Sequence, residues 1–580
     1  MRRAPFQVNP LALSVALLLA TPALALAQDI TTDISTTITS EVSNVGVITI
    51  NNVDNLTQIT GKVLGDAQQP LIKQGTGTLS LTADNGYAGG TSIENGTLAI
   101  SSDLGLGSTD KTLGNNVGNV AISNGASLQT NANINISKDR TLTITGTSTG
   151  AIVNTAGYNS AINGQITGTG KLVKKGGGSL TLGSQTANTY TGGTQIDGGT
   201  LIINKNADLG TGVTLEIKDG ALQVNQNNII IEKNITSTSV SGGGINTAGH
   251  GVKLNGTVSG IGSLIKSGGG TLTLTKTNTH FDTSVLGGTV SITNNDALGT
   301  GAGKLILDGG TLQTTAAMSL AISTKAAPIP VNRDIRIGSG GGTIETVGLN
   351  NALEIAGKIE GVGGLTKTGD GVLTLSGVTN AYTGATTVQQ GQLVLNSLKG
   401  IGSSALVLAG GNVKFLEAVT LSSLTLNGKG GTLDVSAKSS SDQNGPIVTS
   451  VTGVMTGTGN FTKTGNGTLQ LTADNTYTGS TTISGGNLQI TKDTALGTTG
   501  SLILDGGTLQ TTGTASTITL ARGVAITSAG TIDTTTQTNI LSGVVSGQGQ
   551  LIKTGAGILE LKGNNTFQGG IKIKEGTLKI

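Results

Sequence analysis

The chain of 580 residues has no cysteine and no tryptophan, and its aromatic residues are five tyrosines and five phenylalanines. Without cysteine there is no disulfide framework, no thiolate metal site and no thiol nucleophile. Proline occurs only seven times, and glycine follows no three-residue period, which excludes collagen and proline-rich linkers. An exported chain of this composition could fold without waiting for an oxidant.

Strong net charge is also missing, because 34 basic residues nearly balance 32 acidic ones to give a formal charge of +2. This balance leaves no electrostatic footprint for nucleic acid or for acidic lipid, and we expect no nucleic-acid partner. After the first 27 residues no run approaches 18 consecutive apolar residues, so we expect no transmembrane helix in the mature chain.

Residues 1–27 have the layout of a signal peptide. Arg2 and Arg3 form a basic start, residues 11–20 are apolar, and Ala25 and Ala27 flank Leu26 in a small-x-small cleavage pattern. We predict cleavage after Ala27. An uncleaved membrane anchor is the alternative, but an apolar core of about ten residues is short against the roughly 20 that a span needs.

Glycine is plentiful, with 95 residues, and it accompanies many Thr, Ile, Val and Leu residues, which favours short strands separated by turns. One phrase of the form "LIKTGAGILEL" occurs six times, and its copies start at residues 71, 172, 264, 365, 461 and 551. The chain is therefore a tandem array with a long period of roughly 95 residues.

A shorter period lies inside each copy, because a Gly-x-Leu strand such as the one after Gly77 returns after Gly96. About 20 residues is too long for a hairpin and too short for a strand-helix-strand crossover. It suits one coil of an all-β solenoid whose coils pair edge to edge in an elongated rod, with Leu79 and Leu81 facing the core.

Two sets of residues recur in register. One is an aromatic set that follows an asparagine, which we interpret as packing at a coil corner, with a carbohydrate-binding ladder as the alternative. The other is a lysine set, which we interpret as solvated charges beside strand edges, with a ligand-binding row as the alternative. The aromatic set is Tyr87, Tyr190, Phe281, Tyr382, Tyr477 and Phe567, and the lysine set is Lys73, Lys174, Lys266, Lys367, Lys463 and Lys553.

Catalytic patterns are scarce. The only histidines, His250 and His280, have no neighbour at metal-ligand spacing. Ser148 lies in a Gly-x-Ser-x-Gly stretch, but a nucleophile elbow needs a strand-to-helix turn that we do not expect here. Asp308 and Asp505 lie in "LDGGTL" stretches whose order differs from calcium-binding repeats, so we expect them to shape turns. We predict no catalytic, cofactor or metal site.

The stretch "GDGVLTLSGVTNAYTGATTVQQGQLVLN" (residues 369–396) and its five relatives resemble the autotransporter-associated β-strand repeat, also called the passenger-associated transport repeat. The resemblance implies a right-handed parallel β-helix passenger of a Gram-negative bacterium. Such a passenger reaches the cell surface, or is released, through an outer-membrane translocator barrel. The repeats of this family are associated with export of the passenger, and many such passengers are adhesins.

We therefore predict a signal peptide (1–27), N-terminal coils or a cap (28–70) and a solenoid with six repeat units (71–580). The expected function is a non-enzymatic surface stalk and adhesin, with host cells, matrix or a second copy as partners. A polysaccharide lyase or hydrolase and a barrel-less extracellular structural protein are the alternatives. No C-terminal β-barrel is recognisable before Ile580, where the pattern stops at the close of a strand, so we expect a fragment or a truncated reading frame.

Overall fold

The structure is a computed structural model. It describes residues 28–33, 35–43, 45–52, 54–65, 69–110, 118–239, 242–315, 318–319, 333–377, 379–401, 405–436 and 447–580. The predicted signal peptide, residues 1–27, lies outside the described residues. The described chain is all-β, as predicted: a parallel β-solenoid of about 24 turns with roughly 21-residue spacing. Its right-handed sense stays a prediction.

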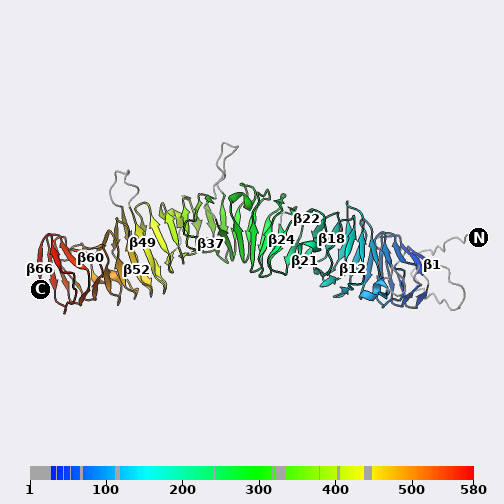
Figure 1. Ribbon diagram of the computed structural model, residues 1–580, viewed down its shortest axis with the longest axis horizontal. Coiled ribbons are helices and arrows are strands. Elements are labelled where there is room, and N and C mark those ends of the chain that lie inside the picture. Colours follow the sequence, from blue (N-terminus) through cyan, green and yellow to red (C-terminus); the bar gives the residue numbers. More distant parts are fainter. Residues whose placement is uncertain are drawn as a thin grey trace, which may run out of the picture. The chain divides into compact units, whose positions relative to one another are not determined.

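The chain divides into two units, and each is a stack of coils. Unit 1 holds residues up to Thr283 together with Leu298–Thr300, and unit 2 holds Ser284–Ala297 and Gly301–Ile580. Within each unit consecutive coils follow one another along the sheets, so the sequence colours change gradually from strand to strand (Figure 1). Among the described residues no helix is both long and apolar enough to cross a membrane.

Three sheets lie wholly in unit 1, the smallest of which pairs β3 (Val42–Ser43) with β6 (Val63–Leu64), and neighbours in each order are hydrogen-bonded. The first, of seven strands, is β1 (Gln28–Thr32), β4 (Val45–Ile50), β7 (Leu71–Gln74), β9 (Thr91–Ile93), β11 (Val120–Ile122), β14 (Leu142–Ile144) and β17 (Ile166–Gly168). The second, of eleven, is β2 (Thr36–Ile38), β5 (Leu56–Ile59), β8 (Thr78–Leu81), β10 (Thr97–Ile100), β12 (Ser127–Thr130), β15 (Ala151–Asn154), β18 (Leu172–Lys175), β20 (Thr194–Asp197), β22 (Thr214–Ile217), β25 (Asn234–Ser237) and β28 (Val258–Ser259).

Three sheets lie wholly in unit 2. One of eleven strands is β35 (Met318–Ser319), β38 (Ala352–Ile355), β41 (Val372–Leu375), β44 (Gln392–Leu395), β46 (Asn412–Phe415), β49 (Gly431–Val435), β52 (Phe461–Thr464), β54 (Thr481–Ile483), β56 (Leu502–Leu504), β59 (Val524–Ile526) and β62 (Val545–Gly547). One of eight is β47 (Thr420–Leu421), β50 (Val448–Val451), β53 (Thr468–Leu471), β55 (Asn487–Ile490), β57 (Thr508–Thr511), β60 (Ala529–Asp533), β63 (Gln550–Thr554) and β65 (Ile571–Ile573). One of four is β58 (Thr517–Leu520), β61 (Thr538–Leu541), β64 (Ile558–Leu561) and β66 (Thr577–Lys579).

Strand register follows the alternation read from the sequence. β8 pairs with β10 in parallel, and this places Leu79 beside Leu98 and Leu81 beside Ile100. All four side chains are buried at 0% exposure. Because strand side chains alternate between faces, the residues between them point to the opposite face of the sheet. Each coil thus adds one aliphatic layer to a core that its two neighbouring coils complete.

A short 3-10 helix follows each of the first five repeats, and the sequence patterns did not predict these helices. Each provides a few backbone carbonyls at the end of a coil that the β-ladder does not use. The helices are η1 (Asp103–Leu106), η3 (Asn206–Leu209), η4 (Asn295–Leu298), η5 (Leu398–Ile401) and η6 (Asp493–Leu496). Polar side chains from neighbouring coils bind these carbonyls.

Candidate functional site

The six recurring lysines are buried, so the prediction of solvated charges is wrong. All six have 0% exposure: Lys73, Lys174, Lys266, Lys367, Lys463 and Lys553. In the first repeat, Nζ of Lys73 donates to the carbonyls of Gln74, Gly75 and Asn95, at 2.7, 2.8 and 3.1 Å. The last of these belongs to the next coil. Lys73 therefore joins its own turn to a neighbouring turn, as do Lys174, Lys367, Lys463 and Lys553.

An ammonium group fits this cradle because it has three protons to donate. Burial lowers the pKa of Lys73, Lys174, Lys266, Lys367 and Lys463 to about 8. At neutral pH these side chains still carry their charge, and the carbonyl dipoles compensate it. The sequence held a signal for this arrangement, because Lys73 shares the inward parity of Leu71 in the same strand.

The asparagines at the coil corners also join neighbouring coils. Oδ1 of Asn85 accepts from the backbone N–H of Val63 at 2.8 Å, and its Nδ2 donates to the Gly105 carbonyl at 3.0 Å. Val63 lies one coil before Asn85, and Gly105 lies in η1 after it. The asparagine side chain thus bonds backbone groups of the coil before it and of the coil after it.

Four tyrosines fill the position two residues after these asparagines: Tyr87, Tyr190, Tyr382 and Tyr477, all at 2% exposure or less. Each hydroxyl is hydrogen-bonded to the hydroxyl of a threonine four residues later, at 2.6 to 2.8 Å. Burial raises the pKa of Tyr477 to about 12. A carbohydrate ladder is not available to these four rings, because they belong to the core.

The third copy differs from the prediction by one residue. Counting two residues from Asn278 gives His280, which is buried at 0% exposure, whereas Phe281 is 49% exposed. Nε2 of His280 lies 2.8 Å from Oγ1 of Thr283. His280 therefore takes the place of the tyrosine. The interpretations of Phe281 as the core ring and of His280 as a tolerated turn residue are both wrong.

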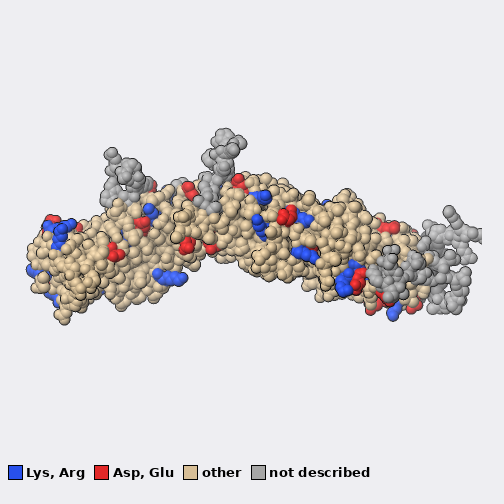
Figure 2. Space-filling view, viewed as in Figure 1, with Lys and Arg blue, Asp and Glu red and all other residues tan. Residues whose placement is uncertain are grey.

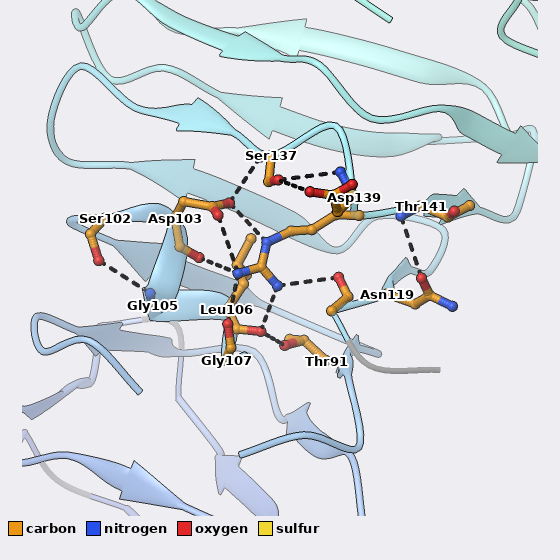
Figure 3. Close-up of polar contacts among 12 residues, drawn as sticks. Thr91, Ser102, Asp103, Gly105, Leu106, Gly107, Asn119, Ser137, Asp139 and Thr141 are labelled. Atoms are coloured by element: carbon orange, nitrogen blue, oxygen red, sulfur yellow. Dashed lines mark hydrogen bonds and ion pairs between the residues drawn. The ribbon is translucent and has the colours of Figure 1, made fainter. Parts of the chain in front are cut away.

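Arginines bind the 3-10 helices, and no recurring sequence pattern predicts them. Figure 3 shows the polar contacts around Asp103, Leu106 and Gly107 of the η1 coil. Arg140 pairs with the carboxylate of Asp103 at 2.8 Å. It also donates to the carbonyls of Leu106, Gly107 and Gly118, at 3.2, 2.7 and 3.2 Å. Arg140 is 1% exposed, so one buried guanidinium joins three segments of the chain through its hydrogen bonds.

The same clip recurs after other repeats. Arg522 pairs with Asp493 of η6 at 2.7 Å and donates to the Leu496 and Gly497 carbonyls. Lys233 and Arg333 hold the carbonyls of Gly210 and Gly303 in the same way. In the fourth repeat unit the aligned residue, two before the start of β48 (Leu424–Leu426), is Ser422. A cation is therefore common at this place but not universal.

The residues examined for catalysis have structural roles. Ser148 lies in an exposed turn between β14 and β15, where its Oγ accepts from the side-chain amide of Asn124 at 2.9 Å. This corner joins two strands, so it is no nucleophile elbow. Asp308 accepts from the Gly340 N–H, and Asp505 accepts from the Thr527 hydroxyl, each at 2.7 Å. Both link neighbouring coils. Within the described ranges no three metal-ligating side chains gather.

The outer surface is polar and evenly charged. Figure 2 shows, on the visible face, acidic and basic side chains scattered among uncharged residues, with no broad area of one sign. In unit 2 a shallow hollow of about 350 Å³ is lined by small residues, among them Gly340, Gly364 and Ala385, and by a column of Thr343, Thr366 and Thr387. Strand pairing places these three threonines side by side on adjacent coils.

The sequence pattern of the passenger-associated transport repeat matches residues 71–100, 172–203, 264–292, 365–395, 461–490 and 551–580. The chain contains six passenger-associated transport repeats. Each begins at the residue where the sequence analysis placed a copy, and this confirms the resemblance. In structural terms, each passenger-associated transport repeat consists of the coil with the buried lysine, the asparagine corner and the next glycine-led coil.

A similar curated protein is "Adhesin BmaC autotransporter" of Brucella suis biovar 1 (strain 1330). It is 49% identical over 136 residues, which cover 23% of this chain and 4% of that protein. The chain thus spans a small part of the relative that it matches. No solved structure matches the chain.

Proposed function

We propose that the chain is the exported passenger of an autotransporter-type protein, and that it acts as a rigid stalk and adhesin at the surface of a Gram-negative bacterium. The six passenger-associated transport repeats carry this proposal. The similarity to part of a protein named as an autotransporter adhesin supports the adhesive role. The signal peptide predicted for residues 1–27 would direct the chain to the first export step.

The architecture suits passage through an outer-membrane translocator, which we propose as a partner. Each coil buries its aliphatic side chains against adjacent coils only, so folding can proceed one coil at a time as the chain emerges. The lysine, asparagine and arginine clips each close within one or two coils. The absence of cysteine means that folding outside the cell requires no oxidant.

We further propose that the passenger works by binding and not by catalysis. This is supported by the structural roles of His280, which replaces a core tyrosine, and of Ser148, which bonds Asn124. The outward threonine column Thr343, Thr366 and Thr387 is a regular polar surface on which weak contacts can repeat from coil to coil. Host cells, extracellular matrix or a second copy are the partners that we propose.

Fusion of the full chain to an outer-membrane translocator tests both parts of the proposal. We expect the fused chain to become sensitive to protease added outside intact cells, and to increase the attachment of the bacteria to host cells or matrix. The matched control replaces Thr343, Thr366 and Thr387 with lysine, which should leave display unchanged and reduce attachment. Retention of the chain in the periplasm would overturn the passenger assignment. Display without any gain in attachment would remove only the adhesive role.

A further inference from the structure

The buried lysines interrupt columns of aliphatic side chains. In the fourth repeat, Lys367 of β40 (Leu365–Thr368) is paired with Ile344 of β37 (Gly342–Thr346) on one side and with Val388 of β43 (Thr386–Val388) on the other. All three side chains are at 0% exposure. The other repeats in which both neighbours are seen have the same order, with Ile48 and Ile93, Val153 and Ile196, Leu433 and Ile483, or Ile532 and Ile573 around the lysine.

Each lysine requires a particular turn in the coil that follows. Nζ of Lys367 donates to the carbonyls of Thr368 and Gly369, and at 3.2 Å to the carbonyl of Gln390 in the next coil. There the left-handed residue is Gly391, with φ of 67°. One coil further on, the residue aligned with Gly391 is Gly411, which does not share its positive φ. That turn has a different backbone conformation, so it does not offer the same acceptor.

The aliphatic core alone does not distinguish one coil from another. Leu, Ile and Val are nearly interchangeable in such a core, and adjacent coils have similar strands. A strand that slides by two residues, or that skips a coil of about 20 residues, keeps its apolar face inward. Loop closure opposes a skipped coil only weakly, because its entropy grows slowly with length. An ammonium group that loses its carbonyl in the next coil is instead unfavourable in the core, because a buried charge is left with one acceptor too few.

We propose that the six buried lysines, one in each repeat unit, fix the register in which the coils stack. This role is independent of adhesion and of the export route. It disfavours skips of one to four coils and slides along a strand, because each would move Nζ away from its acceptor in the next coil, whereas the two acceptors of its own turn move with it. A buried polar residue that specifies register at some cost in stability is known from other repetitive folds.

The absence of cysteine allows a direct test in the full chain. Thr366, Thr387 and Val407 are consecutive in one outward column, with Val407 in β45 (Leu406–Leu408). A T366C/T387C pair reports correct stacking. A T366C/V407C pair is two coils apart, about 9–10 Å, and exceeds disulfide reach unless the β43 coil is skipped. Each cysteine pair is combined with Lys367→Met. The protein is then refolded from urea under reducing conditions and oxidised.

We expect Lys367→Met to raise the T366C/V407C cross-link at least about threefold and to lower the T366C/T387C cross-link, while the unfolding midpoint stays level or rises. The control Ile344→Val should lower the midpoint and leave both cross-links unchanged. Unchanged cross-links in Lys367→Met would overturn the proposal and leave the lysine a stabilising role only.

A second measurement needs no substitution at the lysine, so it decides the matter even if Lys367→Met does not fold. The pKa of Lys367 is lowered to about 8 by burial, with Asp370 and Glu345 as the charged groups nearby. Refolding at pH 10 therefore presents a neutral amine, which has only two protons for three acceptors. We expect more T366C/V407C cross-link after refolding at pH 10 than at pH 7, when both samples are oxidised at the same pH. Equal cross-linking would contradict a register role.

Discussion

The second and third repeats solve the same packing problem with different rings. In the second repeat, Tyr190 reaches Thr194, four residues later, with 2.6 Å between the two hydroxyl oxygens. In the third, His280 reaches Thr283, three residues later, with Nε2 2.8 Å from the hydroxyl. Both threonines donate onward to the carbonyl of a leucine 15 residues later, Leu209 or Leu298. Both corners thus keep a ring-to-threonine bond, and a turn shorter by one residue takes a smaller ring.

The comparison also assigns the proton on His280. The single hydroxyl proton of Thr283 is donated to the Leu298 carbonyl, at 2.9 Å. Nε2 must therefore carry a proton and donate it to Thr283, as the tyrosine hydroxyl does in the second repeat. A glycine lies against each ring: a Cβ on Gly210 would meet the Tyr190 ring at 2.9 Å, and one on Gly299 would meet the His280 ring at 3.0 Å.

The largest expected effect comes from emptying the ring position. Tyr190→Ala should lower the local free energy of unfolding of the second repeat by about 3–5 kcal/mol, because it leaves a cavity in the core. Phe281→Ala in the third repeat should cost less than about 0.5 kcal/mol, because that ring is half exposed. Native-state hydrogen exchange of peptides from 172–203 and 264–292 measures both values. Equal losses would show that the third repeat buries Phe281 after all.

The solenoid could be predicted from the sequence because its two signals are local. Alternation such as that of Leu79 and Leu81 gives the strands, and the return of glycine after about 20 residues gives the coil. The lysines were wrongly predicted to be solvated because their charge was given more weight than the alternation of side chains along the strand. By that alternation Lys73 faces inward with Leu71. The solenoid tolerates this charge because two stacked turns direct three carbonyls at it.

Two other features were not predicted from the sequence. The partner of Arg140 is Asp103, 37 residues earlier, and no short pattern links residues across that separation. In the third repeat, the shorter turn moved the core position from the aromatic residue to the histidine before it. Counting from Asn278 would have identified His280, since the asparagine and not the ring fixes the corner.

An intermediate effect is expected at the asparagine, and here the two repeats should agree. Oδ1 of Asn188 accepts from the Ile166 N–H at 2.8 Å, and Oδ1 of Asn278 accepts from the Val258 N–H at 2.7 Å. Asn188→Ala or Asn278→Ala should each cost about 2 kcal/mol, because a buried N–H loses its acceptor. Hydrogen exchange at Ile166 and Val258 gives the measurement. A loss in only one repeat would mean that the corner depends on its ring more than on its asparagine.

The smallest expected effect is a difference between the second and third repeats in how their stability depends on pH. Burial raises the pKa of Tyr190 above its usual value of 10, so the unfolded chain loses this proton first and the stabilisation disappears as pH rises above 10. The third repeat has histidine there and lacks this dependence. The buried lysines act oppositely in both repeats: Lys174 and Lys266 have pKa values lowered from 10.5 to about 8, so stability rises between those pH values.

Tyr190→Phe isolates the tyrosine contribution, because the lysines are the same in both proteins. At pH 8 the wild type should be more stable than Tyr190→Phe by about 1 kcal/mol, which is the value of one buried hydrogen bond. By pH 11 this difference should shrink by about 1 kcal/mol and vanish. Urea unfolding followed by circular dichroism at the two pH values measures it. A difference that stays constant would mean that the Tyr190 hydroxyl ionises as easily in the folded corner as in the unfolded chain, which a ring sealed between coils does not allow.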